Sequence, residues 1–254
     1  MATKSNIEWK FWGKRDPLWG VAAWKGRNKE GANPWTDEEF YGLGASDWRD
    51  FLLHWRRYGV SDQTAVEIGC GAGRLTMHMA GFFRQVRALD VSEDMIDYAR
   101  KKVGQDGVSF AVVDGSEIPE PTGSVHAVFS AQVFQHLDKQ EDVENYFREI
   151  ARVLIPGGTM MIHIPVFAWP VGAGDWVKRF YGLGRRVDEY KANRLRRDLE
   201  RGGEKGLMRM RSYQIKFFYQ FLPALGFEDI EISVFVTKSN NDPHPFVLAT
   251  KARH

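Results

Sequence analysis

The stretch VEIGCGAGRLT, residues 66–76, decides the fold of this chain. It places Gly69, Gly71 and Gly73 at alternate positions directly after an apolar run, with Glu67 two residues before the first of them. Glycine adopts positive φ at no steric cost and lets a ligand lie against the backbone. A glycine turn of this kind, between a buried strand and a helix, is a common ligand-binding turn of α/β sheets. We therefore expect a strand, a ligand-binding turn and a helix here.

Strands and helices alternate along the chain beyond this turn. The sequence predicts strands at 64–70, 85–91, 108–114, 125–131 and 159–165, helices at 74–83, 93–103 and 140–154, a final helix at 212–226, and late strands at 228–235 and 245–252. The strand runs are almost continuously Val, Ile, Ala and Phe, as expected when helices cover both faces of a sheet. The fold class is therefore α/β, with a doubly wound sheet.

Composition limits the partners and the compartment. Thirty-five Lys and Arg against 33 Asp and Glu leave a net charge of +2, so no overall field favours nucleic acid or a membrane. The single cysteine, Cys70, excludes an internal disulfide and a multi-cysteine metal site. The start MATKSNIEWKFWGKRD lacks the apolar segment of a secretory signal. Residues 153–174 are uncharged, but a Pro-Gly-Gly turn and Pro165 would break a spanning helix. We expect a cytoplasmic protein with no membrane partner.

The spacing of the turn and the next acid indicates a nucleoside ligand. Asp90 ends the second predicted strand, 21 residues after Gly69, and is placed to accept hydrogen bonds from both ribose hydroxyls. A dinucleotide fingerprint needs a further glycine or alanine where this chain has Arg74 and Thr76. A phosphate-binding loop needs Gly-Lys-Ser/Thr, which does not occur.

With these features, residues 60–165 resemble the class I S-adenosylmethionine-dependent methyltransferases. Three further segments within this range carry the resemblance: VVDGSEIP, VFSAQVFQHL and REIARVLIPGGTMMI. The resemblance implies a seven-stranded, mostly parallel sheet with an antiparallel last strand, and S-adenosyl-L-methionine as cofactor. It also implies the cofactor-binding residues: Glu67, Gly69, Gly71 and Gly73 at the turn, Asp90 at the ribose, Met95, Asp114, Gly115 and Ser116 around the adenine, and Ala131 and Gln132 beside the sulfonium. One departure is His126, which stands where many relatives carry an acid.

The resemblance also places His136 on the acceptor side, as a candidate general base. A lone histidine entering a helix is equally often a packing residue, so both interpretations stay open. His163 is interpreted as a core residue and Cys70 as a space-filler. We find no clustered acids for a metal ion, and no Asn/Asp-Pro-Pro motif of the enzymes that methylate nucleic-acid amino groups. The expected enzyme is therefore metal-independent and acts on a small molecule.

The remaining regions are expected to hold the acceptor. The sequence divides into a Trp-rich helical extension (1–60), the cofactor-binding core (61–165), a basic helical lid insertion (166–211), and a final helix with two strands (212–254). Residues 37–55 predict a helix, a glycine turn and a second helix, with Phe40 or Tyr41 against the cofactor. Residues 166–211 carry 12 Lys and Arg against 6 Asp and Glu, so Arg209 and Arg211 are candidates to hold an anionic acceptor. A purely solvated basic face is the alternative.

The expected function is methyl transfer to an oxygen or nitrogen of a small, possibly anionic, acceptor. One alternative is an RNA or protein methyltransferase that uses the basic insertion as its binding surface. Another is a noncatalytic S-adenosylmethionine-binding module. The sequence does not decide between O- and N-methylation, and it does not give the oligomeric state.

Overall fold

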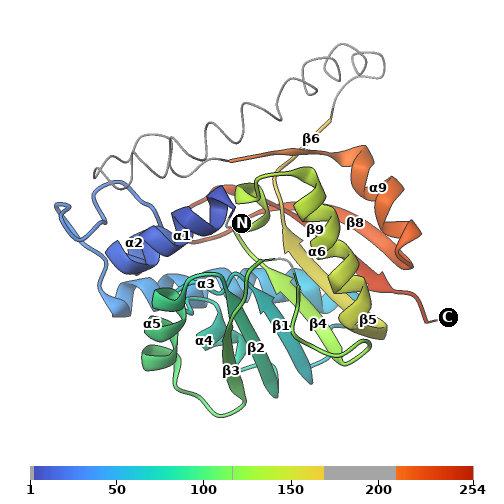
Figure 1. Cartoon of the computed structure of the whole chain (residues 1–254), viewed down its shortest axis with the longest axis horizontal. Helices are drawn as coiled ribbons and strands as arrows, with labels where there is room; N and C mark the ends of the chain where they lie inside the picture. Colours follow the sequence, from blue (N-terminus) through green and yellow to red (C-terminus); the bar gives the residue numbers. More distant parts are fainter. Residues whose placement is uncertain (1–2, 116, 169–209, 254) are drawn as a thin grey trace.

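The computed structural model describes residues 3–115, 117–168 and 210–253, and a seven-stranded sheet forms its centre (Figure 1). In spatial order the strands are β3 (Val108–Val112), β2 (Gln85–Asp90), β1 (Thr64–Ile68), β4 (Val125–Ser130), β5 (Leu154–His163), β9 (Pro243–Lys251) and β8 (Phe227–Val236). Strands β1 to β5 are parallel to one another, whereas β9 is antiparallel to both β5 and β8. The predicted fold class, including the antiparallel last strand, is confirmed.

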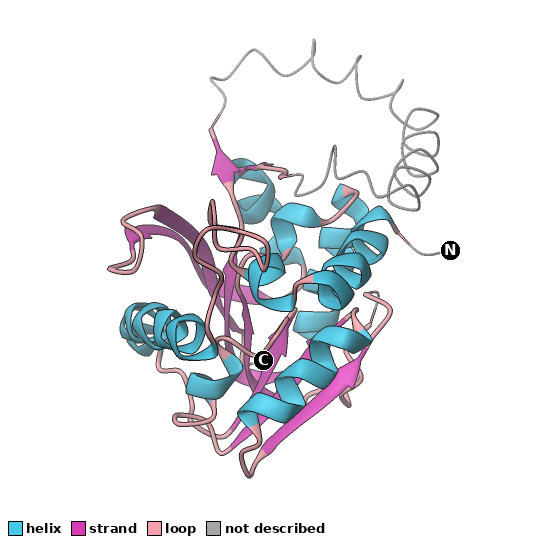
Figure 2. Cartoon of the chain, turned by 90° about the vertical axis from the view of Figure 1, so that its left-hand side faces the viewer, coloured by secondary structure: helices cyan, strands magenta, loops and turns pink. Residues whose placement is uncertain are grey.

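Helices cover both faces of the sheet (Figure 2). Val66 and Ile68 of β1 pack into the cluster that contains α6 (Gln140–Val153) and α9 (Ile215–Ala224). Ala65 points to the other face, where α3 (Asp37–Trp55) and α4 (Thr76–Met79) pack. Alternate strand residues are thus buried on opposite faces, which explains why the strands are apolar throughout. A two-residue parallel pairing joins β6 (Val166–Phe167) to β7 (Tyr213–Gln214).

Helix α5 (Glu93–Val103) has the bounds that the sequence predicted. Ser92 caps it, since its hydroxyl oxygen accepts the Met95 N–H at 3.4 Å. Gly104 ends it in the left-handed conformation, with φ 36°. These local signals suffice because a capping side chain and a terminal glycine satisfy the free backbone groups at the two ends.

The amino-terminal residues form α1 (Lys4–Arg15), α2 (Pro17–Val21), α3 and a short 3-10 turn, η1 (Arg56–Tyr58). An aromatic cluster joins the first three helices to the glycine turn and α5; its buried members are Trp12, Leu18, Ala22, Phe40, Tyr41, Ala72 and Met95. The Trp-rich segment is therefore helical in the described residues and packs on the glycine turn and α5. No helix in the described residues is long and apolar enough to cross a bilayer.

Two predicted helix boundaries are wrong. Residues 37–55 form one continuous helix, with no glycine turn. Gly44 lies inside it because a Cβ there would stand 2.2 Å from the carbonyl oxygen of Arg74, so this glycine permits close packing of α3 on the glycine turn. The helix predicted at 74–83 contains a single α-helical stretch of 4 residues, α4, since the chain leaves Gly73 at φ 80° through turns.

Candidate active site

A cavity of about 770 Å³ lies at the carboxyl edge of the five parallel strands. The residue that ends each strand, or the next one, lines it: Ile68, Asp90, Val113, Ala131 and His163. Helices α1, α2, α3 and α6 and the β8–β9 turn also contribute to its described wall. In open α/β sheets, this edge is where ligands bind.

Two of the three glycines serve this cavity. Gly69 and Gly71 line it with φ of 73° and 52°, whereas Gly73 does not line it. A Cβ on Gly69 would lie 2.2 Å from Val133, and one on Gly71 would lie 2.5 Å from Val21. The missing side chains thus let other segments close over the turn. At Gly73, a Cβ would lie 2.7 Å from the Val103 side chain, so this glycine is needed to seat the turn on α5.

Asp90 is buried at the end of β2, and its carboxylate accepts hydrogen bonds from the backbone of the glycine turn and of its own turn. One carboxylate oxygen accepts the Gly71 N–H at 2.8 Å and the other accepts the Ser92 N–H at 2.9 Å. Burial raises the pKa of the carboxyl, and the backbone donors partly oppose this. Each oxygen keeps a second lone pair, so the group remains able to accept from a ribose hydroxyl.

Glu67 and Tyr41 lie behind the glycine turn and do not line the cavity. The Glu67 carboxylate accepts the Thr76 hydroxyl at 2.5 Å, and its burial raises the pKa to about 7. The Tyr41 hydroxyl donates to the Ala72 carbonyl at 2.8 Å. In the structure both side chains therefore hold the turn in shape; direct contact with a cofactor stays a prediction for each.

The expected adenine residues are placed together with α1. Met95, Asp114 and Gly115 line the cavity, while Ser116 lies outside the described residues. Asn6 of α1 donates to the Asp114 carbonyl oxygen at 2.6 Å. The sequence did not single out Asn6, because nothing local in this helix marks the face that closes a cavity.

His136 lines the cavity in the 3-10 turn η2 (Phe134–His136), close to Ala131 and Gln132, which line it as well. The Gln135 side-chain nitrogen donates to Gln132 Oε1 at 2.6 Å and lies 3.2 Å from His136 Nε2. The Trp9 ring meets the His136 ring edge-on, with centroids 4.9 Å apart. These contacts set the orientation of the imidazole at the cavity wall.

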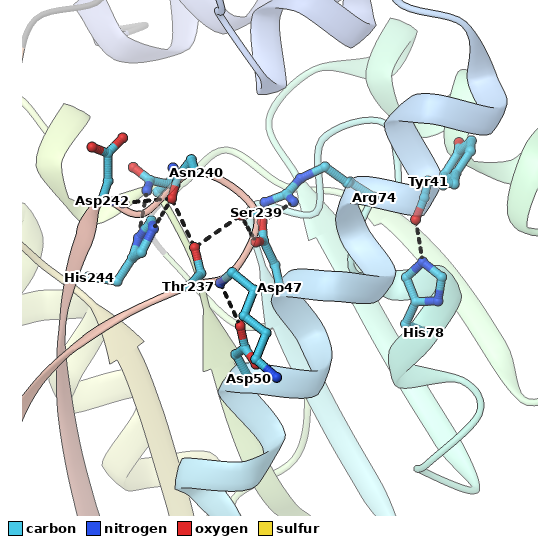
Figure 3. A network of polar contacts seen from close by, with 12 residues as sticks. Tyr41, Asp47, Asp50, Arg74, His78, Thr237, Ser239, Asn240, Asp242 and His244 are labelled. Atoms are coloured by element: carbon cyan, nitrogen blue, oxygen red, sulfur yellow. Dashed lines mark hydrogen bonds and ion pairs between the residues drawn. The ribbon is translucent and has the colours of Figure 1, made fainter.

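A polar network from distant segments closes the side of the cavity under the β8–β9 turn (Figure 3). Asp47 of α3 forms a buried ion pair with Arg74 of the glycine turn and also accepts the Ser239 hydroxyl. Nearby, His244 Nε2 lies 3.5 Å from the Asn240 side-chain oxygen. None of this network was predicted, except that Arg74 was read as a departure from the dinucleotide motif.

His163 is buried, as predicted for a core residue, but it also lines the cavity. Its ring packs against His244, with centroids 5.4 Å apart. Burial lowers the pKa of His163 to about 3 and also lowers the pKa of His244. The available sequence signal was a polar residue at the carboxyl end of an otherwise apolar strand.

Of the two predicted anion-binding arginines, Arg211 is described by the structure, and it does not line the cavity. Arg209 lies outside the described residues. Arg211 donates from its guanidinium to the Asp138 carbonyl oxygen at 2.5 Å, and its N–H donates to the Gln135 carbonyl oxygen at 2.8 Å. Arg211 therefore ties its own segment to the η2 region, and anion binding by it stays a prediction.

The described wall of the cavity is acidic. Its charged residues are seven acids (Asp47, Asp90, Asp114, Glu117, Asp138, Asp142 and Asp242) and the two cations Lys10 and Arg74. Such a wall favours a cationic ligand by complementary potential. Within the described ranges, no group of three or more His, Cys, Asp or Glu side chains is placed to hold a metal ion.

The sheet, the glycine turn, the buried acid after β2 and the cavity at the strand ends define a nucleoside-binding α/β protein of the class I methyltransferase fold. A family profile described as a methyltransferase domain matches residues 66–162. Residues 66–162 therefore match a methyltransferase domain in sequence, and the sheet has the fold of the class I S-adenosylmethionine-dependent methyltransferases, whose cofactor is S-adenosyl-L-methionine.

Comparison with known proteins gives the same class. The chain is 36% identical over 101 residues to the malonyl-(acyl-carrier protein) O-methyltransferase of Hahella chejuensis, covering 39% of this chain and 35% of that protein. It is 33% identical over 101 residues to the fatty-acid O-methyltransferase of Mycolicibacterium smegmatis, covering 39% and 36%. The matched part thus spans about a third of the length of these curated relatives.

Among solved structures, the magnesium protoporphyrin IX methyltransferase of Synechocystis PCC 6803, crystallised with S-adenosylhomocysteine, superposes with a TM-score of 0.60. The match covers 98% of this chain and 99% of that one at 15% identity, so it shows the fold. The residues present here fit the cofactor of the class. Asp90 presents a buried carboxylate, Gly69 and Gly71 expose backbone, and the acidic wall suits a cationic sulfonium.

Proposed function

We propose that this protein is a methyltransferase that transfers a methyl group from S-adenosyl-L-methionine to an oxygen or nitrogen of a small molecule. The observation that carries the proposal is the continuity of the cavity. It runs from Asp90 and the glycine turn, past Ala131 and Gln132, to His136 and His163. A cofactor and an acceptor would therefore have neighbouring places in one continuous cavity.

The bound cofactor supplies an electrophilic methyl group on a sulfonium. The chain's own residues are proposed to supply alignment, exclusion of water and removal of a proton, since methyl displacement needs an in-line approach. Asp90 holds the ribose end in place, and Val21 and Val133 close over the glycine turn. Water is excluded by the aromatic residues of α1 and by the apolar strand ends.

His136 is the proposed general base for a hydroxyl or amine acceptor. Its imidazole lines the cavity beyond Gln132, and the Gln135 amide and the Trp9 ring orient it. The proton taken from the acceptor passes to this ring and then to water. An acceptor that reacts as a carboxylate needs no base, and His136 would then only position it.

The experiment that tests the proposal uses S-adenosylmethionine with an isotope-labelled methyl group. The protein is incubated with this cofactor and a pool of metabolites, and products are sought by mass spectrometry as a gain of one labelled methyl group. Asp90→Ala serves as the inactive control. Tight cofactor binding without any labelled product would instead identify a noncatalytic binding module. Label appearing only in RNA or protein would identify a macromolecular acceptor.

A further inference from the structure

The order of the strands gives the cavity two ends. Asp90, Gly69 and Gly71 lie over β1 and β2, at the end expected for the cofactor's nucleoside. The opposite end lies over β4, β5 and β9. We call it the histidine end, and define it by Gln132, Gln135, His136, His163 and His244, all of which line the cavity.

The five side chains of the histidine end are connected. Gln135 donates to Gln132 Oε1 at 2.6 Å, and its nitrogen lies 3.2 Å from His136 Nε2. Gln132 Nε2 lies 3.4 Å from His244 Nδ1, and the His244 ring packs on His163. The group starts at Gln132, the residue expected beside the sulfonium, so a ligand held by it would lie next to the transferred methyl group.

Two buried polar atoms of this group have no hydrogen-bond partner in the described part of the chain. They are His163 Nδ1 and Gln135 Oε1. The residues are 3% and 4% exposed. Buried polar atoms are almost always hydrogen-bonded, so each of these atoms calls for a specific partner. Because both residues belong to the cavity wall, a ligand in the cavity is suitably placed to provide it.

The chemistry of Gln135 limits what that ligand is. The amide nitrogen of Gln135 is directed at Gln132 Oε1 and His136 Nε2, so the atom left without a partner is the oxygen. An amide oxygen only accepts hydrogen bonds. The ligand must therefore carry an O–H or N–H donor. A hydroxyl or an amine has one, whereas an ionised carboxylate does not.

The charges at the histidine end point the same way. Burial keeps the rings of His163 and His244 neutral by lowering their pKa values. Asp47 and Asp242 line the cavity near these rings, and Arg74, the cation that the described wall offers on this side, is paired with Asp47. At this end, an anionic acceptor would thus meet carboxylates and neutral imidazoles, and the cation of the described wall there, Arg74, is already paired with Asp47.

We propose that the histidine end binds the methyl acceptor as a hydroxyl or amine compound without negative charge, which donates to Gln135 Oε1 and hydrogen-bonds to His163 Nδ1. This inference rests on the proposed function. The acceptor's lone pair forms the bond to the methyl carbon as the carbon–sulfur bond breaks, and that electron pair stays on sulfur. The acceptor's proton passes to His136. The assignment departs from the anionic acceptor expected from Arg209 and Arg211.

The chemical stability of the product tests the acceptor class. The protein is incubated with tritium-methyl S-adenosylmethionine and a bacterial metabolite extract supplemented with equal amounts of catechol, tyramine, benzoate and octanoate. The products are then treated with mild alkali. We expect the label to remain non-volatile, as in methyl ethers and methylamines. Release of volatile labelled methanol would show a methyl ester, and would overturn the inference while leaving the proposed function intact. Cofactor binding without labelled product would remove both.

Variants test the two atoms on the acceptor identified in that experiment. His163→Leu and Gln135→Leu are each expected to lower kcat/KM for the acceptor about 10- to 100-fold, the effect of losing one buried hydrogen bond. Affinity for S-adenosylhomocysteine should stay within about twofold, and His163→Asn should recover part of the activity. Thermal melting with S-adenosylhomocysteine verifies that each variant is folded.

The matched control is His126→Leu. His126 is another described histidine whose Nδ1 is buried without a partner, but it lies near the amino end of β4 and does not line the cavity. We expect its activity to equal that of the parent. If Gln135→Leu and a folded His163 variant both kept the parent kcat/KM, the assignment of the acceptor to the histidine end would be wrong.

Discussion

The two ends of the cavity are built in different ways. At the end over β1 and β2, which we call the cofactor end, the contacts are mostly with the backbone. Asp90 accepts from the N–H groups of Gly71 and Ser92, which lie in the turns that follow the neighbouring strands β1 and β2. At the histidine end, side chains from η2, β5 and β9 meet although they are far apart in the sequence. The cofactor end therefore depends on local conformation, whereas the histidine end depends on long-range packing.

The largest effect is expected from removing the ion pair between Asp47 and Arg74, which connects the two ends. Arg74 and Asp47 are 9% and 8% exposed, so Arg74→Met leaves a carboxylate buried beside Ser239 without its cation. We expect the free energy of unfolding to fall by about 3 to 5 kcal/mol, as measured by urea denaturation. The double variant Asp47→Asn, Arg74→Met should regain most of this. Equal losses in the single and double variants would show that the unpaired carboxylate of Asp47 is not the cause of the loss.

At the cofactor end, Asp90→Ala should weaken cofactor binding strongly. Loss of a charged acceptor for two ribose hydroxyls, and release of the Gly71 N–H, should raise the Kd for S-adenosylhomocysteine about 100- to 1000-fold. Isothermal titration calorimetry measures this. Asp94→Ala, which removes an exposed acid in the first turn of α5, is the control and should bind normally. Unchanged affinity in the Asp90 variant would disprove its role at the ribose.

At the histidine end, His136→Ala should act on turnover. As the proposed base, its loss is expected to lower kcat roughly 100-fold for a hydroxyl or amine acceptor. The Kd for S-adenosylhomocysteine should not change, because Asp90 and the glycine turn remain intact. Near-normal kcat in a folded variant would assign His136 to packing against Trp9.

The smallest expected effect is a pH dependence of stability that comes from Glu67, behind the glycine turn. Its pKa is raised by burial from 4.5 to about 7 in the folded protein, so the folded state holds a proton that the unfolded state has lost. Between pH 5 and pH 7 this carboxyl should therefore lower the free energy of unfolding by roughly 2 kcal/mol. Glu67→Gln keeps an acceptor for the Thr76 hydroxyl and should remove this fall, as followed by thermal or urea unfolding at both pH values.

The matched control for that experiment is Glu149→Gln. Hydrogen bonding to Arg152 lowers the pKa of Glu149, so its contribution is present above its unfolded pKa and is lost only on further acidification. Between pH 5 and pH 7, this variant should show the same pH dependence as the parent. A parent protein with no fall in stability over this window would mean that Glu67 is ionised in the folded state.

The sheet and the position of Asp90 at its carboxyl edge could be predicted because their signals are local. Ser92 and Gly104 cap α5 at the expected residues, and Asp90 follows directly from the end of a strand. The same local logic failed for α3. Gly42 and Gly44 were interpreted as a turn, but the need of Gly44 to lie against the Arg74 backbone comes from another segment. No pattern within residues 37–55 contains that information.

The histidine end was missed for the same physical reason. His163 was recognised as buried, yet its place in the cavity depends on which strands are neighbours, namely β5 beside β4 and β9. Gln135 and His244 are unremarkable in the sequence, and only the register of β9 against β5 brings His244 near His163. Gly73 was assigned to the cofactor by the same motif; in the structure it packs on α5 and does not line the cavity, and its contact with a cofactor stays a prediction.

The carboxylate of Asp47 has a consequence for the energetics of binding. One of its contacts belongs to the turn that faces the cofactor, and another, Ser239, belongs to the turn above the acceptor. A cofactor that shifts Arg74 therefore alters the hydrogen bond to Ser239, and an acceptor that moves Ser239 acts back on Arg74. Thermodynamic linkage requires the two influences to be equal, so each ligand changes the affinity of the other by the same factor. Titrating the protein with S-adenosylhomocysteine, with and without the acceptor, would measure this coupling.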